Sequence, residues 1–445
     1  MKRREFIRKT ALTTAAALAG PYLLPSGRLF AQTNSKLADH VVLVMFAGGV
    51  RQQEGILQRY LADSQNVAIE GNILYNLFEG TAPIDKIVYG TDANLVGEIP
   101  IPRILSQPIN KQGTIFREMH SSSAGHYGGL NVMLQGNTLL GQGLKQRPKN
   151  PTIFEYLRRH GGYSATDMWF VGNGIGNSIP LLNHSNHIEY GRKYGANFLA
   201  PSITFSDIGF EHLSNAKVYH PELELEPIAK MKYFLDNVFH NIGESMAGLD
   251  NTADEKQQIE AFLKDMFTAT QNGTVAKAPV SDNGDLQISG YACEVMKRFS
   301  PALTVVNFNN VDSCHGNFSG YLKSLHRADH AVGFMWDYIQ TQIPSMSGNT
   351  VMLVVPECGR DLKPNPILDD NDWRGFDHSD ANTSRIFGAM IGKNVPSNLS
   401  IGDENNPIGL SSDIAPTIAE ILGIKTTVMN SGLLASDAMS LFDRM

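Results

Sequence analysis

The sequence predicts an α/β fold, a three-layer α/β/α sandwich around a mostly parallel central sheet, on two observations. Short runs of consecutive apolar and β-branched residues recur along the chain, as is typical of strands buried on both faces of a parallel sheet. Segments with the apolar spacing of amphipathic helices lie between these runs. Strands that alternate with helices form mostly parallel sheets whose two faces are covered by the helices.

Four apolar runs are the predicted strands of this sheet. Their continuous apolar character indicates that both of their faces are buried. The first run ends at the pair Gly48-Gly49 and the second at Gly172-Asn173, where glycine interrupts regular structure. The runs are His40–Phe46 (HVVLVMF), Met168–Val171 (MWFV), Leu303–Phe308 (LTVVNF) and Val351–Val355 (VMLVV).

Three segments are predicted to be helices that cover the sheet. Residues 151–160 (PTIFEYLRRH) open with proline, which is favourable at a helix start, and then place apolar residues on one face. Tyr321–Gln340 carries an apolar stripe at helical spacing, and Ile414–Leu422 is amphipathic.

The domain organisation is predicted to be one α/β domain over residues 38–445, with residues 181–300 as a helical insertion or cap on the sheet. The middle region differs from the rest in its polar composition: the pattern of residues 226–271 predicts two polar helices around Gly248. A chain of just over 400 residues suits one large domain with insertions, or two domains.

The N-terminal segment, residues 1–31, is predicted to be a twin-arginine signal peptide. Arg3 and Arg4 form the arginine pair, and a mild apolar stretch, Ala11–Leu24, precedes the small residue Ala31. This stretch is too short and too weakly apolar for a membrane-spanning helix, which needs roughly 20 apolar residues. We therefore expect the folded protein to be exported to the periplasm or the extracellular space, with the twin-arginine translocase as its partner during export.

The charge and cysteine content exclude several classes of protein. After residue 31 the chain holds 31 Lys and Arg against 43 Asp and Glu, a formal charge of −12. This excess of acid argues against binding to nucleic acid or to an anionic membrane surface. No later segment is apolar for long enough to span a bilayer, so no stable membrane span is expected. Three cysteines, an odd number, form no disulfide framework.

Polar side chains with metal-binding chemistry follow two of the predicted strands, where sites form in open α/β sheets. An aspartate and a histidine three residues apart on one loop can both face a single metal ion, and their oxygen and nitrogen atoms suit zinc, manganese or iron. The residues are Asp312 and His315 after the third run, Glu357 and Arg360 after the fourth, and the later pair Asp377 and His378.

A serine-rich stretch, His120–Gly129, precedes the helix-like run Leu130–Leu134. A helix N-terminus offers free N–H groups and a partial positive charge, which suits a nucleophile or a bound anion. Ser123 and His126 are the candidate catalytic residues of this stretch. The alternative is a serine-rich turn that caps a helix.

The order of these elements resembles the alkaline phosphatase superfamily, which includes arylsulfatases and phosphodiesterases. It looks closest to the exported sulfatase-like proteins of unknown function that carry a twin-arginine signal. The stretch Ser411–Ile424 (SSDIAPTIAEILGI) is similar to the Asp-Ile-x-Pro-Thr helix near the end of many members. The resemblance covers most of residues 38–445 and is weakest in 181–300.

The resemblance implies roles for five residues. Asp312 and His315 would supply the Asp-plus-His half of one metal site, which His378 completes. Glu357 stands where the family has the aspartate of an Asp-His pair for a second metal ion, and Cys358 stands where that pair has its histidine. The resemblance leaves the divalent ion open among zinc, manganese and calcium.

The sequence departs from the family at two points. The first strand of the family ends in a metal-binding aspartate, whereas here Phe46–Gly49 holds no carboxylate. The family nucleophile lies ten residues before a glycine that ends the next helix, and counting back from Gly136 leads to His126. The nearest hydroxyl is that of Ser123. The Cys-x-Pro-Ser-Arg motif of sulfatases is absent from the sequence.

Two hypotheses of function follow. The first is a metal-dependent hydrolase of a phosphate or sulfate ester, a small anionic substrate. In this hydrolase, Arg360 would bind the anion in a bidentate manner. Glu357 or Asp377 would be a further metal ligand or a general base. His126 would be a nucleophile or would position a water molecule. The second hypothesis is a non-catalytic, exported binding or assembly protein that keeps the fold.

Overall fold

The computed structural model describes residues 35–62, 67–83, 99–138, 147–173, 182–209, 249 and 251–445. The predicted signal peptide, residues 1–31, lies outside the described residues, and so do residues 226–248 of the predicted polar helices.

Within the described residues, eight strands form one sheet in the order β10-β4-β9-β8-β1-β7-β5-β6. Strand β9 runs antiparallel to both its neighbours, and the other pairings described in this sheet are parallel. The predicted fold class is therefore confirmed. The strands are β1 His40–Phe46, β4 Thr114–His120, β5 Met168–Gly172, β6 Asn197–Leu199, β7 Leu303–Phe308, β8 Thr350–Pro356, β9 Arg385–Gly392 and β10 Leu399–Ile401. A separate antiparallel pair joins β2 Arg59–Ala62 to β3 Val67–Glu70.

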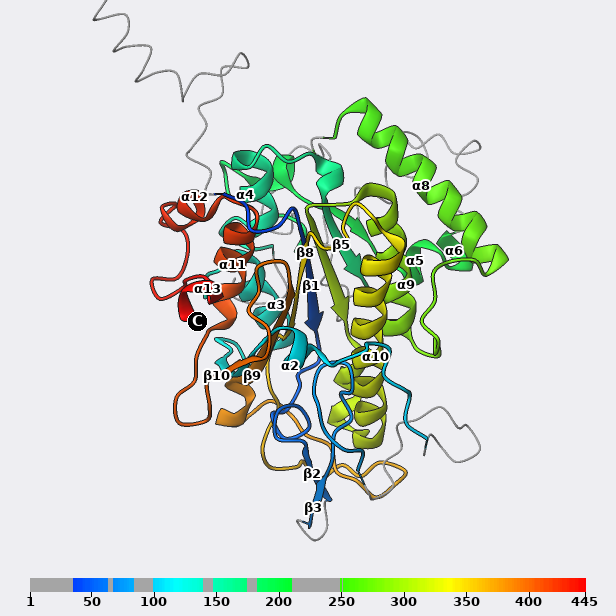
Figure 1. The fold of residues 1–445 in the computed structure, drawn as a ribbon, viewed down its shortest axis with the longest axis vertical. Helices are drawn as coiled ribbons and strands as arrows, with labels where there is room; N and C mark the ends of the chain where they lie inside the picture. The colour runs from blue at the N-terminus through cyan, green and yellow to red at the C-terminus, as the bar shows by residue number, and fades with distance from the viewer. Residues whose placement is uncertain are drawn as a thin grey trace, which may run out of the picture.

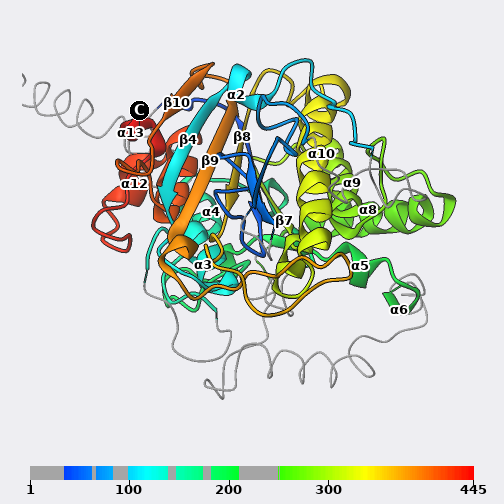
Figure 2. The same ribbon diagram turned by 90° about the horizontal axis from the view of Figure 1, so that it is seen from below.

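Helices cover both faces of the sheet, as Figures 1 and 2 show. One face is covered by α9 Gly284–Phe299 and α10 Phe318–Gln342. The other is covered by α3 His126–Gln135, α4 Ile153–His160 and α11 Ile414–Ile421. The three predicted helices are thus confirmed as α4, α10 and α11.

Two hydrophobic cores result, because successive side chains of a strand point to opposite faces. Val42 and Val44 of β1 belong to the core that includes buried residues of α9 and α10. Val41 and Leu43 belong to the core that includes α3, α4 and α11. The central strands are therefore buried on both faces, which explains their unbroken apolar sequences.

The remaining elements are short, except for α8 at the margin of the molecule (Figure 1). None of the described helices is both long and apolar enough to cross a membrane. The α-helices of the described residues not yet named are α2 Ile109–Gln112, α5 Pro201–Thr204, α6 Asp207–Gly209, α8 Ala253–Asn272, α12 Lys425–Met429 and α13 Leu441–Arg444. Short 3-10 helices span Ala165–Asp167, Gly191–Tyr194, Asn310–His315, Ala381–Ser384 and Ser411–Asp413.

The region 181–300 contributes two elements to the sandwich itself. Strand β6 pairs with β5 at one edge of the sheet, and α9 packs against α10, β7 and β5. Helix α8 lies beyond α9 in Figure 1, and its Phe262 side chain packs against Trp169 of β5 and Phe299 of α9. An insertion with the boundaries 181–300 stays a prediction, since residues 210–248 are not among those described.

Candidate metal centre

The loops that follow β1, β7 and β8 converge at one edge of the sheet. Phe46 at the end of β1 is in register with Phe308 of β7 and with Pro356 of β8. Because the three strands are parallel neighbours, the residues beyond their carboxyl ends lie close together. This edge holds Asp312 and Glu357, the carboxylates that follow β7 and β8.

Two overlapping groups of side chains at this edge have the composition of a metal site. In each group, one potential ligand atom per residue lies within 4.8 Å of the others. His126 belongs to both groups and faces them with different nitrogen atoms. The first group is His126, Asp312, His315 and His378, and the second is His126, Glu357 and Cys358.

His126 is the first residue of α3, which ends at Gly136 in the left-handed conformation (φ 65°). Its Nε2 atom lies 2.9 Å from Asp312 Oδ1, and its Nδ1 atom lies 2.7 Å from Glu357 Oε1. Burial lowers the pKa of His126, but the hydrogen bonds to Asp312 and Glu357 outweigh it and raise the pKa to about 9. The ring is therefore an imidazolium between two carboxylates at neutral pH in the metal-free protein.

His378 offers an unused lone pair to the first group. Its Nδ1 atom donates a hydrogen bond to the Gly359 carbonyl at 2.9 Å, so the proton of the neutral ring resides there and Nε2 is the acceptor. That Nε2 atom is buried and has no hydrogen-bond partner. Burial, with the nearby charges of Arg360 and His126, lowers the pKa of His378 to about 3. The ring is thus neutral over the physiological pH range.

His315 is held by Asp377, whose Oδ1 lies 2.6 Å from His315 Nδ1. Asn365 donates to Asp377 Oδ2 and to the His315 carbonyl, which fixes both residues. The Nε2 atom of His315 then faces Asp312 Oδ1 at 3.5 Å. A carboxylate behind a histidine is typical of metal sites, because it fixes the ring orientation and the tautomer. Asp377, predicted as a ligand or base, lies behind His315 and outside both groups.

Glu357 is buried and uses only one of its two oxygen atoms. Oε1 accepts the Gly48 N–H at 2.5 Å and faces His126, while Oε2 is buried without a hydrogen-bond partner. A buried acceptor that lacks a partner costs about 1–3 kcal/mol. A cation bound to Glu357 Oε2 would remove this cost, and so would one bound to His378 Nε2 in the other group. The oxygen and nitrogen ligands therefore fit a divalent ion such as zinc, manganese or iron.

Arg360, the predicted anion-binding residue, makes its hydrogen bonds within the protein. It is buried, and its guanidinium donates to the Gly49 carbonyl, to the Phe376 carbonyl and to Asp312 Oδ1. Three of the five N–H groups of this buried guanidinium are thus used within the protein, and its part in binding a substrate anion stays a prediction. Arg360 positions Asp312 and holds the loop of Phe376 against the turn that follows β1.

Ser123 is not brought into either group. Its hydroxyl donates to the Gly125 carbonyl and accepts the Gly125 N–H, both at 3.2 Å, within the same turn. Ser121, a neighbour that the sequence did not single out, donates to the Glu357 carbonyl at 2.7 Å. Of the two candidates in this stretch, only His126 lies among the metal-ligating side chains.

The turn after β1 has no room for a carboxylate at two of its positions, Gly48 and Gly49. Gly48 (φ 134°) and Gly49 (φ 75°) adopt conformations that other residues rarely take. A Cβ atom on Gly48 would lie 2.4 Å from the Asp312 nitrogen, and one on Gly49 would lie 2.7 Å from His378 Cε1. No side chain fits here, and the Gly48 N–H binds Glu357 instead. The glycine pair is the one sequence signal for this contact.

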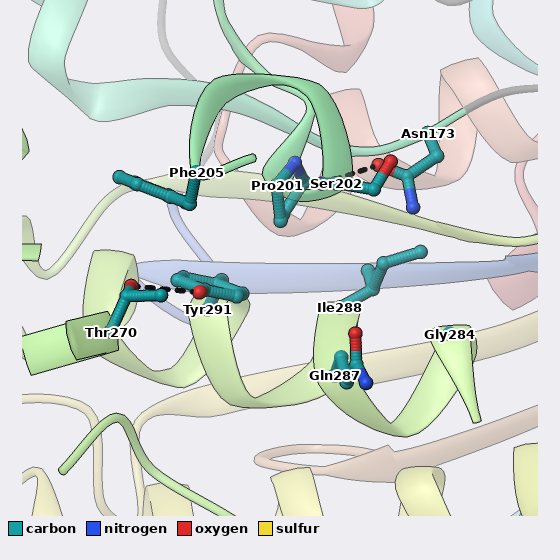
Figure 3. A pocket seen from close by; sticks show the side chains of 9 residues that line it. All are labelled: Asn173, Pro201, Ser202, Phe205, Thr270, Gly284, Gln287, Ile288 and Tyr291. Atoms are coloured by element: carbon teal, nitrogen blue, oxygen red, sulfur yellow. Dashed lines mark hydrogen bonds between the residues drawn. The ribbon is translucent and has the colours of Figure 1, made fainter. Parts of the chain in front are cut away.

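A cavity of about 290 Å³ lies beyond the carboxyl ends of β5 and β6. Figure 3 shows the Phe205 and Tyr291 rings on one side of it and the amides of Asn173 and Gln287 on the other. None of its lining residues belongs to the two metal-ligating groups. One wall is the start of α9, where Asp285 accepts the N–H groups of Asn309 and Asn310, just before Asp312.

No protein-family model and no curated protein matches this sequence. The chain is similar to a solved structure of a protein in the alkaline phosphatase superfamily from Vibrio parahaemolyticus, at 12% identity and a TM-score of 0.42, over 88% of this chain and 69% of that one. It is similar to a phosphonate monoester hydrolase from Silicibacter pomeroyi, at 11% identity and a TM-score of 0.43, over 91% and 76%.

A third similar structure is a lipoteichoic acid synthase from Listeria monocytogenes, at 9% identity and a TM-score of 0.39, over 97% of this chain and 80% of that one. At these identities and TM-scores, the chemistry of this chain has to be argued from its own site residues.

Proposed function

We propose that the protein is an exported, metal-dependent hydrolase of a phosphate or sulfate ester with a divergent active site. One observation carries the proposal: His126, Asp312, His315 and His378 each offer a ligand atom within 4.8 Å of the others, and His378 Nε2 is buried without a hydrogen-bond partner.

The residues of the first group, Asp312, His315, His378 and His126, would hold the divalent ion. When bound, such an ion polarises an ester oxygen and lowers the pKa of a water molecule. The neighbouring residues supply rigidity: Arg360 holds Asp312, and Asp377 holds His315. Fixed ligands of this kind favour a single coordination geometry.

The position of His126 supports an anionic substrate. The N-terminus of a helix carries a partial positive charge and free N–H groups, which attract anions. His126 begins α3 and stands beside the proposed metal ligands, so an ester anion bound there would lie against the helix and the imidazole together. As a ligand through Nε2, with Nδ1 paired to Glu357, the His126 ring has no proton to give to the leaving oxygen; its part would be to fix the ion beside the start of α3.

A second candidate function is a non-catalytic, exported binding or assembly protein. Two observations favour it: the turn Gly48-Gly49 has no room for a carboxylate, and the Ser123 hydroxyl stays within its own turn. Such a protein would bind the metal ion as a structural element without turnover.

Turnover distinguishes the two functions. Purified protein, with zinc or manganese added, is tested on aryl phosphate monoesters, phosphate diesters and sulfates, with and without a chelator. The hydrolase predicts turnover that the chelator stops, that His126→Ala abolishes and that Ser123→Ala and the control His187→Ala retain. Bound metal without turnover on any substrate favours the binding protein.

Export by the twin-arginine route is a separate part of the proposal. Replacement of Arg3 and Arg4 by lysine is expected to keep the protein in the cytoplasm of a host with this translocase. Unchanged export of that variant would contradict the twin-arginine assignment and would leave the metal site unaffected.

A further inference from the structure

The loop 361–375 carries several apolar side chains that face the solvent. Among the described residues, eight large apolar side chains are exposed, and three of them lie in this loop: Leu362, Ile367 and Leu368. Pro366, which precedes Ile367, is exposed as well. Single exposed apolar residues are normal in proteins, but here Pro366, Ile367 and Leu368 follow one another directly. We call these three residues the apolar run.

Hydrogen bonds hold the apolar run in one position. The Ile367 N–H donates to Asn365 Oδ1 at 2.9 Å, and the Ile367 carbonyl accepts the Gly375 N–H at 3.0 Å. Leu368 pairs with Arg374 across the loop in an antiparallel bridge. The exposure of Ile367 and Leu368 is therefore part of the folded loop, although contact of apolar surface with water is unfavourable. A bound apolar group would cover this surface and gain the free energy of its burial.

The apolar run borders the first group of metal-ligating side chains. Ile367 Cγ2 lies 3.7 Å from the point that a Cβ atom on Gly316 would occupy, and Gly316 directly follows His315. Asn365, which fixes Ile367, also donates to the His315 carbonyl and to Asp377. The side chains of His315 and Asp377 are 44% and 45% exposed, so solvent reaches the first group on this side. A ligand held at the first group therefore has the apolar run as a neighbour.

The composition of the loop disfavours ligands that are rich in charge or in hydroxyl groups. The side chains of the apolar run have no hydrogen-bond donor or acceptor, so they cannot pair with the hydroxyl groups of a sugar. The loop 361–375 holds four aspartates against one lysine and one arginine, and the chain after residue 31 has a formal charge of −12. A second anionic group on the ligand, or an anionic membrane surface, would be repelled.

We infer that Ile367 and Leu368 form a subsite for the alcohol part of the ester, and that this part is an uncharged hydrocarbon group. The inference rests on the proposed function, because the anionic part of the ester has to be held at the first group for the alcohol part to reach the loop. A methylene group that becomes fully buried raises affinity about fourfold. On an open loop, where one side of the ligand stays in water, we expect a rise of about twofold per methylene.

A series of alkylphosphonates, from methyl to hexyl, measures this rise. A phosphonate resembles the anion of a phosphate ester but has no ester bond to cleave, so binding is measured apart from turnover. Each compound is titrated by calorimetry into the zinc-loaded full chain. The inference predicts that affinity rises about twofold per methylene in the unmodified chain. The variant with both Ile367→Ser and Leu368→Ser is expected to lose this rise and to bind methylphosphonate as before.

Ile203→Ser is the matched control, because Ile203 of α5 is 58% exposed and Ile367 is 52% exposed. The control is expected to keep the rise with chain length. Both positions face water, so thermal melts of the variants without ligand should match that of the unmodified chain. A fall in melting temperature of the double variant would show a structural role for the apolar run and would overturn the inference.

The outcomes separate this inference from the proposed function. Binding of methylphosphonate with equal affinity for the longer compounds would overturn the subsite and leave the anion site intact. No binding of any phosphonate and no turnover of any ester would contradict both. A rise with chain length that the double variant retains would also overturn the inference. So would a dimer of the unmodified chain in sedimentation that the double variant dissolves, because the apolar run would then be an interface between two copies.

Discussion

His326 in α10 and His378 beside the metal groups have much in common. Both donate through Nδ1 to a backbone carbonyl, that of Ile73 at 2.6 Å and that of Gly359 at 2.9 Å. Burial lowers the pKa of both, to about 4 and about 3 respectively. The difference lies in Nε2: that of His326 accepts the Ile101 N–H at 2.8 Å, whereas that of His378 is buried with no partner.

The carboxylates around these two histidines repeat the contrast. Asp329, one turn from His326, accepts hydrogen bonds from the Asn76 and Leu77 N–H groups and from the Asn76 amide. Glu357, near His378, leaves one buried oxygen without a partner. In this comparison, the protein itself satisfies the buried polar atoms of His326 and Asp329, whereas it leaves one atom each of His378 and Glu357 without a partner.

The largest expected effect is that of His378→Ala. Because this change removes the free lone pair, we expect ester hydrolysis to fall to background and the rise in melting temperature on addition of zinc to vanish. The free energy of unfolding without metal should fall by only about 1 kcal/mol, through loss of the hydrogen bond from Nδ1 to the Gly359 carbonyl, since Nε2 has no protein partner to lose. Turnover assays and thermal melts with and without zinc measure both effects, and turnover of the variant at the unmodified rate would contradict the assignment.

Metal affinity is expected to rise with pH, because the pKa of His126 is about 9 in the metal-free chain. Below that pH, binding through Nε2 must displace one proton from the imidazolium. The association constant should therefore rise about tenfold per pH unit between pH 6 and 8.5. His378 adds nothing to this slope, since it is already neutral in this range. Zinc titrations against a competing chelator measure the slope, and a flat profile would show that His126 is not a ligand.

Asp377→Asn tests the carboxylate behind His315. An asparagine keeps the size of the side chain but loses the charge that pairs with His315 Nδ1. We expect zinc affinity to fall by about 10–100-fold. Asp380→Asn is the matched control, since Asp380 lies nearby and accepts the Leu362 N–H without contact to a ligand. Equal affinities of the two variants would show that Asp377 has no part in the site.

His326→Ala is expected to act on stability and not on metal. It leaves the Ile73 carbonyl and the Ile101 N–H without partners and opens a cavity beside α10. We expect a loss of about 2–4 kcal/mol in the free energy of unfolding, with zinc affinity unchanged. Urea denaturation gives the first quantity and zinc titration the second. A loss of zinc binding in the folded variant would remove the distinction between the two histidines.

The sequence was most informative for the strands whose side chains are buried on both faces of the sheet. Strands β1 and β7 agree with their predicted limits, because both faces of these central strands are apolar. Strand β9 (RIFGAMIG) was not predicted: two glycines weaken its pattern, and its antiparallel place between β4 and β8 depends on tertiary contacts. The pairing of β6 with β5 involves three residues, too few for a periodic signal.

For the site, the sequence indicated which residues meet but not which way each one points. Asp312, His315, His378 and His126 do come together, since all follow strands or begin a helix at one edge of the sheet. The direction of Arg360 depends on the carbonyls of Gly49 and Phe376, which are distant in sequence. The position of Asp377 behind His315 likewise depends on how the loop 361–375 folds back, through Asn365.

The metal content of the purified protein tests the central claim most directly. The unmodified chain and the variant carrying both Asp312→Ala and His378→Ala are purified alike, and bound metal is measured by elemental analysis. We predict about one or two equivalents of a divalent ion in the unmodified chain and loss of the ion at the first group in the folded double variant. Equal metal content in the two proteins, or none in the unmodified chain after incubation with zinc, would contradict the account.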